Sequence, residues 1–441
     1  MIVFISDLHF IDETAGQHNI PAKAFDKFLE SIKVHQKKAK AKKLKIIFLG
    51  DTFDLLRTEE WFKEKEEDRP WGNNNTDKMK KRAKKILEKI ENRNKDTLNL
   101  LSKKALDERF KVVDVETIYI PGNHDRLCWM INELKEKTID LLDLNDCNNE
   151  NFRPYFSDAE YGVYAIHGHE LDSFNYEGGS NYTSENYKIT PIGDLIATEI
   201  ITKIPYKLIK KIESKDLLNE QEKIQLKNNF QEIDNIRPLS ATLEWLLFKI
   251  RESENLKEII KDTINEIMHE FNELSFVKNW YESHDKWYYP FDTPDLIQAF
   301  IYCLQKIKLF SSEELLDILG KAKKIVCSVL DAIGSSELFY TLVENIKFNN
   351  NIHYIVMGHT HVPLQRPIFY YNPENKKMLK SIYFNTGTWR KTYYYYKCKE
   401  GNRFVERKNM NYVIIYTPKE KPNKHNLPVF ETWQGTLKGE E

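Results

Sequence analysis

The 441-residue sequence has little cysteine, no long apolar run and almost no net charge. Its cysteines lie far apart along the chain: Cys128, Cys147, Cys303, Cys327 and Cys398. An odd number of scattered cysteines is typical of reduced thiols. The cysteine pattern therefore excludes a disulfide framework and a cysteine-based zinc site.

The chain also lacks the features of a membrane or secreted protein. No apolar run approaches the ~20 residues that a membrane-spanning helix needs. The mean hydropathy is −0.60 and charged residues make up 30% of the chain. The first residues, Met1–Asp7, carry neither a basic leader nor a small-residue cleavage site. We therefore expect a soluble, cytoplasmic protein with no membrane span.

The charges are balanced, with 66 Lys and Arg against 67 Asp and Glu. A protein that binds polyanions over its whole surface usually has a basic excess, so nucleic acid is not a favoured partner. Two local basic runs keep that alternative open. Lys37–Lys43 is more simply explained as the solvated end of a helix, where cations complement the helix dipole. Lys80–Lys85 lies near acidic residues that offset it.

Five short apolar runs each end at a cluster of polar residues. Runs of this length bounded by glycine or proline predict buried strands. They are Ile2–Ile5, Ile46–Leu49, Ile118–Ile120, Tyr161–Ile166 and Tyr354–Met357. Amphipathic stretches predict helices over Ala22–Lys43, Met79–Phe110 and Leu127–Leu144. This alternation of strands and helices predicts a layered α/β fold.

The middle of the chain departs from this alternation. Helical periodicity covers Leu195–Ile212, Ala241–Phe271 and Pro294–Leu309, and Pro205 is expected to kink or split the first of them. We therefore predict a helical insertion over residues 185–344, between a first part (1–184) and a second part (345–441) of one α/β domain. After the insertion, strand-prone aromatic segments follow at Lys377–Phe384, Thr392–Tyr396 and Asn411–Tyr416.

Metal-ligand side chains follow the ends of the five predicted strands. They are Asp7, His9, Asp51, Asn123, His167, His359 and His361. In open α/β sheets, groups beyond the carboxyl ends of strands meet in one crevice. Seven oxygen and imidazole donors are too many for one ion and suit two that share a carboxylate. The mixed donors favour Mn, Fe, Zn, Co or Ni over Mg or Ca, and two such ions can clamp a phosphoryl group.

These clusters resemble the motifs of a known family. The motifs are Asp7-x-His9, Gly50-Asp51-x-x-Asp54, Gly122-Asn123-His124-Asp125, His167 and Gly358-His359-x-His361. In this order they resemble the calcineurin-like metallophosphoesterases, over about Met1–Glu170 and Asn351–Trp389. The resemblance implies a layered β-sandwich flanked by helices, with the large helical insertion added. It also implies two divalent ions, with Mn favoured, and hydrolysis of a phosphorylated substrate.

The resemblance assigns roles to individual positions. It implies that one metal is held by Asp7, His9, Asp51 and His361, and the other by Asp51, Asn123, His167 and His359. It implies that a metal-bridging hydroxide attacks phosphorus while His124 assists the leaving oxygen. We expect Asp125 to orient the His124 imidazole, with turn capping as the alternative.

Three further residues are candidates for supporting the ligands or contacting substrate: Asp54, His169 and Arg390. His169 competes with His167 for one ligand position, and the resemblance favours His167. Leu55 and Asp125 stand where Ser/Thr protein phosphatases of this superfamily carry Arg and Glu, so that class is disfavoured. We expect hydrolysis of a phosphodiester or a small phosphorylated metabolite.

Two alternatives remain open. One is a nuclease acting on DNA or RNA with a partner protein, although related repair nucleases usually have His where Asp54 stands. The other is a non-catalytic scaffold on the same fold. The sequence leaves the oligomeric state undetermined.

Overall fold

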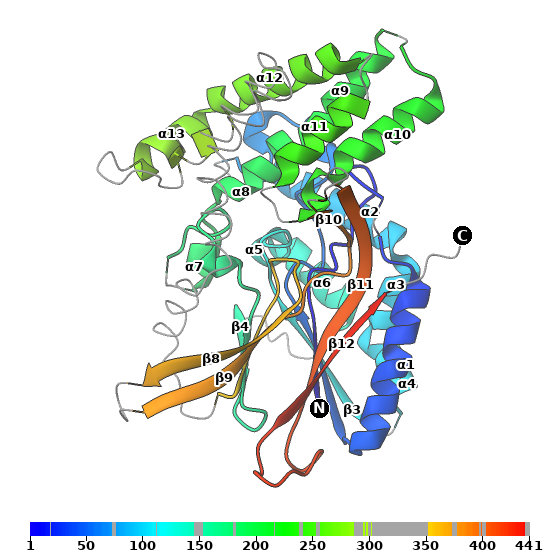
Figure 1. Ribbon diagram of the computed structural model, residues 1–441, viewed down its shortest axis with the longest axis vertical. Helices are drawn as coiled ribbons and strands as arrows, with labels where there is room; N and C mark the ends of the chain where they lie inside the picture. Colours follow the sequence, from blue (N-terminus) through cyan, green and yellow to red (C-terminus); the bar gives the residue numbers. More distant parts are fainter. Residues whose placement is uncertain are drawn as a thin grey trace.

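The computed structural model places two β-sheets and their flanking helices beneath a helical layer (Figure 1). It describes residues 1–436 except for the following positions: 18, 73–75, 112, 145–152, 180–181, 216, 238–240, 253–255, 286–293, 296, 299–300, 302–351, 373–376, 397 and 399–402. The helix expected over Pro294–Leu309 and the end of the predicted insertion therefore lie largely outside the described residues.

The larger sheet has the strand order β3-β2-β1-β11-β10-β6, with β12 paired to β11. Its strands are β1 (Ile2–Ile5), β2 (Lys43–Leu49), β3 (Asp114–Ile120), β6 (Ile236–Arg237), β10 (Lys391–Tyr396), β11 (Arg403–Tyr416) and β12 (Val429–Thr436). The first three are parallel, so their carboxyl ends lie at one edge of the sheet.

The smaller sheet has the order β4-β5-β7-β9-β8. Its strands are β4 (Tyr155–Asp158), β5 (Val163–Ile166), β7 (Tyr354–Met357), β8 (Leu364–Asn372) and β9 (Lys377–Asn385). Here β5, β7 and β9 are parallel. All five strands predicted ahead of the polar clusters are present, as are the three predicted near the C-terminus.

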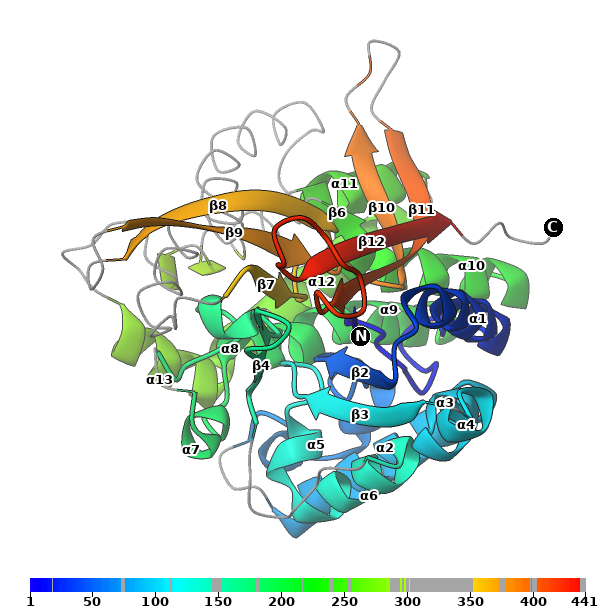
Figure 2. The ribbon, with the colours of Figure 1, turned by 90° about the horizontal axis from the view of Figure 1, so that it is seen from below.

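Alternation along the strands explains the layers. In β1, Ile2 and Phe4 face a core shared with the smaller sheet, whereas Val3 and Ile5 face a second core under the helices. The core between the sheets includes Ile47, Ile120, Val163, Val356, Phe384 and Ile415. The predicted layered α/β sandwich with flanking helices is thereby confirmed (Figure 2).

The helices belong to two groups. Those of the α/β part are α1 (Ala22–Ala39), α2 (Asp77–Arg93), α3 (Lys95–Leu101), α4 (Lys103–Arg109), α5 (Leu127–Met130) and α6 (Asn132–Leu142). Those after β5 are α7 (Ser184–Tyr187), α8 (Ile192–Leu195), α9 (Lys203–Glu213), α10 (Glu220–Gln231), α11 (Thr242–Glu252), α12 (Lys257–Glu273) and α13 (Ser275–His284). Short 3-10 turns are η1 (Glu59–Lys63), η2 (Glu66–Asp68), η3 (His169–Leu171) and η5 (Glu232–Asn235), and a π-helical segment is η4 (Ile196–Thr202).

Several predicted helices are shorter than their hydrophobic periodicity. The stretch Met79–Phe110 is three helices, because the chain breaks at Asn94 and Ser102. Asn94 turns its amide back to the Ile90 carbonyl (2.8 Å). Ser102 is extended and caps α4 through the Ala105 amide (3.4 Å).

Two other boundaries also differ from the prediction. α1 ends at Ala39 because Lys40 adopts a left-handed conformation (φ 52°), and β2 begins at Lys43. Extended backbone at Ile131 divides Leu127–Leu144 into α5 and α6. Hydrophobic periodicity alone does not reveal such interruptions, because the helices on either side of each break pack against the same apolar core.

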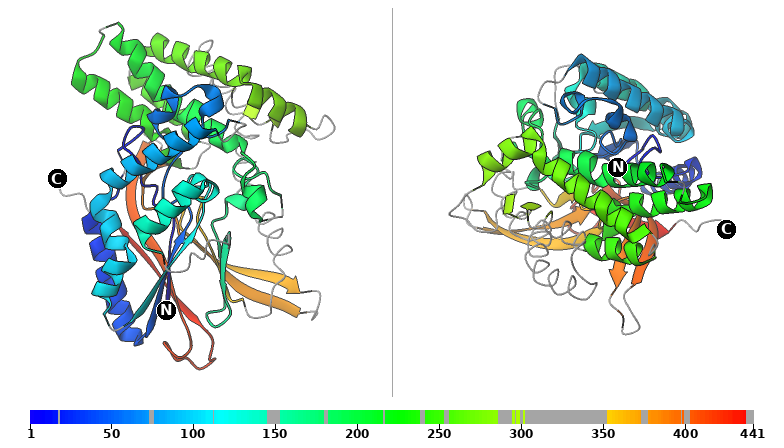
Figure 3. Two further views of the ribbon diagram at one scale, coloured as in Figure 1. Left: turned by 180° about the vertical axis from the view of Figure 1, so that it is seen from behind. Right: turned by 90° about the horizontal axis from the view of Figure 1, so that it is seen from above.

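The helical layer has its own apolar core, which includes Ile204, Phe230, Ile264, Phe271 and Trp280. It lies above the carboxyl ends of the strands (Figure 3). The stretch predicted over Leu195–Ile212 changes from the π-helical η4 to α9 at Lys203, two residues before Pro205, so an irregularity occurs beside this proline. The layer is not wholly helical, because Ile236–Arg237 forms β6 against β10. Among the described residues, every helix is too short or too polar to cross a membrane.

Candidate metal centre

The predicted ligands come from both sheets and meet at one edge of the sandwich. Asp7 and Asp51 follow β1 and β2, Asn123 follows β3, and His167 and His359 follow β5 and β7. Among the described residues, three groups of side chains have their ligand atoms within 4.8 Å of one another, and one of them is His9, Asp54 and His124. The other two groups contain the predicted ligands. They are Asp7, His9, Asp51 and His361 in the first, and Asp51, His167 and His359 in the second. Asp51 belongs to both.

The backbone at this edge is strained. Positive φ angles occur at Asp7 (51°), His9 (46°), Asp51 (50°), His359 (68°) and His361 (61°). Residues other than glycine rarely adopt this backbone conformation, and the strain persists only where surrounding contacts enforce it. Five of the seven predicted ligands therefore have a left-handed backbone conformation in the segments that follow their strands.

Backbone contacts join the separate motifs. The Asp7 amide donates to the Gly50 carbonyl (3.1 Å), and the His9 amide donates to the Asp51 carbonyl (2.8 Å). The His359 amide donates to both carboxylate oxygens of Asp7 (3.1 and 3.0 Å). These hydrogen bonds fix the ends of β1, β2 and β7 relative to one another.

Two motif glycines make room for the ligands. A Cβ atom on Gly50 would lie 2.2 Å from Nδ1 of His167, and Gly50 has a φ of 81°. A Cβ atom on Gly122 would lie 2.2 Å from Oδ1 of Asp51. Any larger residue at either position would displace the side chain behind it.

The first group is compact and buried. Nε2 of His9 and Nε2 of His361 are 2.9 Å apart. Oδ1 of Asp7 lies 3.3 Å from Nε2 of His361, and Oδ2 of Asp51 lies 3.6 Å from Nε2 of His9. Two imidazole nitrogens and two carboxylates thus point at a common position, as the ligands of one cation do.

The second group has its imidazoles in tautomers suited to a metal. Nδ1 of His167 donates to the Leu49 carbonyl (2.8 Å), which leaves Nε2, 3.3 Å from Oδ2 of Asp51, as the ring nitrogen that would bind a metal. Nε2 of His359 donates to Oδ2 of Asp172 (2.9 Å), which leaves the lone pair on Nδ1. Such carbonyl and carboxylate partners orient metal-binding histidines.

Two buried ligand atoms without a hydrogen-bond partner in the described part of the chain show that the residues fit a metal. Oδ1 of Asn123 and Nε2 of His167 are buried and have no hydrogen-bond partner among the described residues. The Asn123 amide nitrogen donates to Oδ1 of Asn175 (3.2 Å), which turns its oxygen the other way. Buried acceptors without a partner are costly, and a cation beside them would satisfy both.

His361 differs from the other imidazoles. Nη2 of Arg237 donates to Nδ1 of His361 (2.5 Å), which places the proton of the neutral ring on Nε2. For Nε2 to bind a cation, that proton has to move to Nδ1, and Arg237 has to release the ring. Arg237 comes from β6 in the helical layer, so this layer contacts the first ligand group directly.

The electrostatic field of the carboxylates favours positive charge here. Burial opposes protonation of His167, but Asp51 raises the pKa of His167 to about 10. Against burial, Asp54 and Asp51 raise the pKa of His124 to about 9. Burial lowers the pKa of His9 to about 4, so His9 is neutral and able to act as a ligand. A divalent cation between the carboxylates would take the place of these protons.

Asp54, rather than Asp125, orients His124. Nδ1 of His124 donates to Oδ1 of Asp54 (2.9 Å). Asp125 accepts backbone N–H groups instead, from Thr52 (2.7 Å) and Gly122 (2.6 Å). The expectation that Asp125 orients the imidazole is therefore wrong, and its alternative of capping the turn describes the contacts. The sequence could not reveal this pairing because Asp54 lies 70 residues from His124, whereas Asp125 is its neighbour in the chain.

His169 and Arg390 lie behind the ligand groups. His169 is buried and belongs to neither group; its ring is 5.3 Å from that of His167. Arg390 is buried as well, with Nη1 4.0 Å from Oδ2 of Asp54. It donates to Asp234 (3.2 Å) and Asn235 (2.6 Å) of the helical layer. Both residues therefore lie next to the site and contact side chains around it, outside the ligand groups.

Sequence analysis missed the loop that follows η3. Asp172 accepts from His359 and from Nδ2 of Asn175 (2.7 Å), and Asn175 in turn holds Asn123. Neither residue follows a strand or belongs to a spaced motif, so no signal in the sequence distinguishes them from other loop residues.

Comparison of the sequence with models of protein families identifies the family of this chain. The model described as calcineurin-like phosphoesterase matches residues 1–363. The chain belongs to the calcineurin-like phosphoesterase family. The matched region runs through the helical layer and includes every predicted ligand. Neither the curated proteins nor the solved structures contain a match to the chain. For this member of the family, the described residues thus include buried Asp/His clusters suited to a divalent metal centre.

Proposed function

We propose that the protein is a dinuclear metal-dependent hydrolase acting on a phosphate ester or anhydride, either a phosphodiester or a small phosphorylated metabolite. The observation that carries this proposal is the position of Asp51, which is shared by the two ligand groups. A carboxylate between two sets of imidazole and carboxylate donors is the arrangement expected for two neighbouring cations.

The ligand assignment follows from the two groups. Asp7, His9, Asp51 and His361 would hold one cation; Asp51, Asn123, His167 and His359 would hold the other. The mixed nitrogen and oxygen donors suit Mn²⁺, and also Fe, Zn, Ni or Co. When bound, the two cations supply positive charge to the phosphoryl oxygens and lower the pKa of a water nucleophile.

His124 is the residue we propose to assist the leaving group. Its side chain is 14% exposed, whereas those of His9, Asp51 and Asp54 are almost fully buried. The Asp54 carboxylate holds its Nδ1 proton, which leaves Nε2 as the atom able to donate a proton to a departing oxygen. A positively charged imidazole there also stabilises negative charge that develops on that oxygen.

We further propose that residues 185–344 are an insertion that caps the site, between the first part (1–184) and the second part (345–441) of the phosphoesterase domain. The support is a set of buried contacts around Asp234. Its carboxylate accepts from Arg57 (2.9 Å) and Arg390 (3.2 Å), and both arginines also contact Asp54 beside His124. Removing the cap should therefore change which substrates reach the metals.

The experiment that tests this function is a substrate screen with Mn-loaded protein. The substrates are a phosphomonoester, a phosphodiester, nucleotides and single-stranded DNA, with Asp51→Asn and Asp158→Asn run alongside. Asp158 pairs with Lys45 (3.0 Å), outside the ligand groups, and is the matched control. We expect turnover by wild type and Asp158→Asn and its loss in Asp51→Asn. Full activity in Asp51→Asn, or no turnover by metal-loaded wild type, would refute the proposal.

A further inference from the structure

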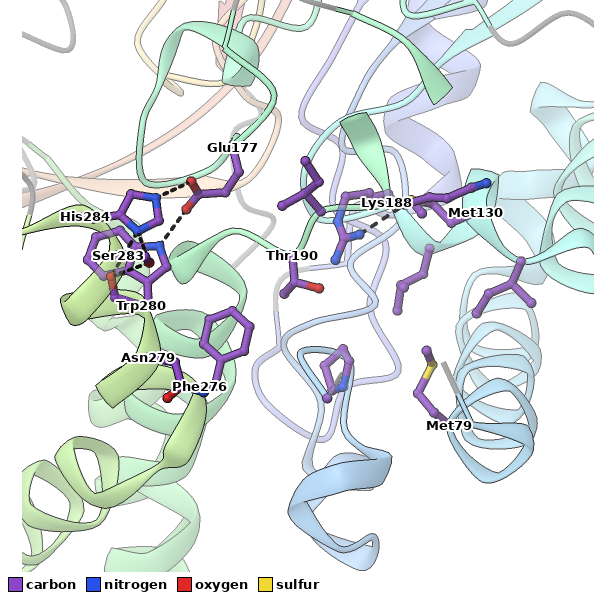
Figure 4. Close-up of a pocket in the computed structure, with 16 residues that line it drawn as sticks. Met79, Met130, Glu177, Lys188, Thr190, Phe276, Asn279, Trp280, Ser283 and His284 are labelled. Carbon is purple, nitrogen blue, oxygen red and sulfur yellow. Dashed lines mark hydrogen bonds and ion pairs between the residues drawn. The ribbon is translucent and has the colours of Figure 1, made fainter. Parts of the chain in front are cut away.

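A cavity of about 540 Å³ lies between α13 of the helical layer and α5 of the α/β part. Figure 4 shows Phe276 and Asn279 on one side and Met79 and Met130 on the other, with Thr190 between them. A cavity of this size accommodates a small organic ligand. Neither the ligand groups nor His124 line it, so its function is separate from metal binding.

The facing walls suit the two faces of a flat ring. Phe276 presents an aromatic ring from α13, and the thioethers of Met79 and Met130 come from α2 and α5. Aromatic rings stack on one another, and methionine sulfur makes favourable contacts with ring edges and faces. Leu127 and Ile131 extend the apolar wall beside Met130.

Polar groups also line the cavity. The hydroxyl of Thr190 and the amide of Asn279 line the cavity and make no hydrogen bond among the described residues. Arg126 lines it too, with its guanidinium held by Asp194 (2.6 Å) and the Tyr187 carbonyl (3.0 Å). Thr190 is partly exposed and Asn279 is exposed, and a heteroaromatic ring carries donors and acceptors that can pair with both, which an aliphatic chain lacks.

The α13 wall is fixed in place. Glu177 accepts from Nε1 of Trp280 (2.7 Å) and from Nε2 of His284 (2.9 Å). The two rings stack with centroids 4.4 Å apart and planes 15° apart. The three residues appear together at the left of Figure 4. The cavity is therefore preorganised, which lowers the entropic cost of binding.

The same loop joins this cavity to the proposed metal centre. At one end Asp172 holds His359 (2.9 Å), and Asn175 holds Asn123 (3.2 Å). At the other end Glu177 holds α13. On the opposite wall, Arg126 lies only two residues beyond His124. The cavity and the proposed metal centre are therefore built on the same two chain segments, residues 172–177 and 124–126.

From these contacts we propose that the cavity binds a planar heteroaromatic ring, of the size of a nucleoside, carried on the leaving group of the substrate. The link to the leaving group rests on the proposed hydrolase function. The binding of the ring itself does not, because its partners are Phe276, Met79, Met130, Thr190 and Asn279.

Calorimetric titration with adenosine tests the proposal independently of hydrolysis. The full-length protein is titrated in EDTA, because adenosine carries no phosphate and needs no metal. We expect saturable binding at one site for adenosine and none for ribose. Phe276→Ala should weaken adenosine binding about tenfold, the loss expected for one aromatic contact. Lys278→Ala, on the same helix and paired with Glu273 (2.6 Å), should bind as wild type does.

A second variant covers the case in which Phe276→Ala fails to fold. Asn279→Ala removes only an exposed amide and should also weaken adenosine binding. The proposal is overturned if wild type does not bind adenosine, if ribose binds as well, or if Phe276→Ala and Asn279→Ala both bind normally. Binding of octanoate in place of adenosine would assign the cavity to an aliphatic chain and would overturn it too. Adenosine binding without any phosphoesterase activity would support the cavity and refute only the proposed function.

Discussion

Oδ1 of Asp54 accepts a hydrogen bond from Nδ1 of His124 at 2.9 Å, and Oδ2 of the same carboxylate lies 3.4 Å from Nδ1 of His9. Burial opposes the ionisation of Asp54, yet His124 and His9 hold its pKa well below the usual range. One buried carboxylate thus orients both a proposed metal ligand and the proposed proton donor. This pairing makes the roles of His124 and Asp54 separable by mutation.

His124→Ala should retain its metal and lower kcat by about 10²–10⁴-fold, the contribution of a general acid. Asp54→Ala should lower kcat by about 10–100-fold, as expected for a residue that orients such a group. With the metal sites saturated, so that the contact of Asp54 with His9 no longer limits metal content, the double variant should be no slower than His124→Ala. The measurement is kcat together with metal content. Multiplicative losses in the double variant, or loss of metal from His124→Ala, would contradict these roles.

Asp172→Asn should weaken binding of the cation held by His359. Asp172 fixes the Nε2 proton of that ring, and removing such a partner typically costs about 10–100-fold in metal affinity or activity. Competitive titration with a chelator measures the affinity, with Asp158→Asn as the control. Unchanged affinity for both cations would show that Asp172 has no part in the site.

Much of the site could be predicted from the sequence because each ligand follows a recognisable strand. The run Ile46–Leu49 ending at Gly50-Asp51 is readable locally, and parallel strands bring such endings together. Asp172 and Arg237 could not be found in this way. Their positions depend on a loop and on a two-residue strand within the helical layer, and neither has a local pattern.

The fold, like the site, was predictable from the sequence only in part. Strands were predictable from short apolar runs, and the sandwich from their alternation with helices. The breaks at Asn94 and Ser102 were not, although Ser102 is a recognisable capping residue. The competing roles of Asp54 and Asp125 also required coordinates, because only geometry shows which carboxylate reaches the imidazole.

Removing metal should destabilise the protein. The ligand groups bring Asp7 and Asp51 together in a buried setting, where their charges are stabilised by a cation. At a free metal concentration about a hundred times Kd, each site contributes about 2.7 kcal/mol to the free energy of unfolding. Thermal unfolding with Mn²⁺ and with EDTA should show a lower Tm in EDTA, and Asp51→Asn should show a smaller difference. Equal Tm values for wild type in both conditions would argue against a resident metal.

Glu60, in η1 beyond the second motif, gives a prediction for pH. Burial opposes its ionisation, but hydrogen bonds from Lys63 and Lys89 lower its pKa from 4.5 to about 2. Its stabilising effect is therefore complete above about pH 4.5 and is lost as the pH falls toward 2. The difference in unfolding free energy between wild type and Glu60→Gln should be constant from pH 7 to 5 and shrink from pH 4.5 to 3. A difference that grows in that range would contradict the lowered pKa.

The most direct test of the central claim is an anomalous difference map from crystals of the Mn-loaded protein. Two sites sharing Asp51 predict two anomalous peaks about 3.5–4 Å apart. The carboxylate of Asp51 should lie between them, with His9 and His361 beside one peak and His167 and His359 beside the other. A single peak, or peaks remote from Asp51, would contradict the dinuclear centre.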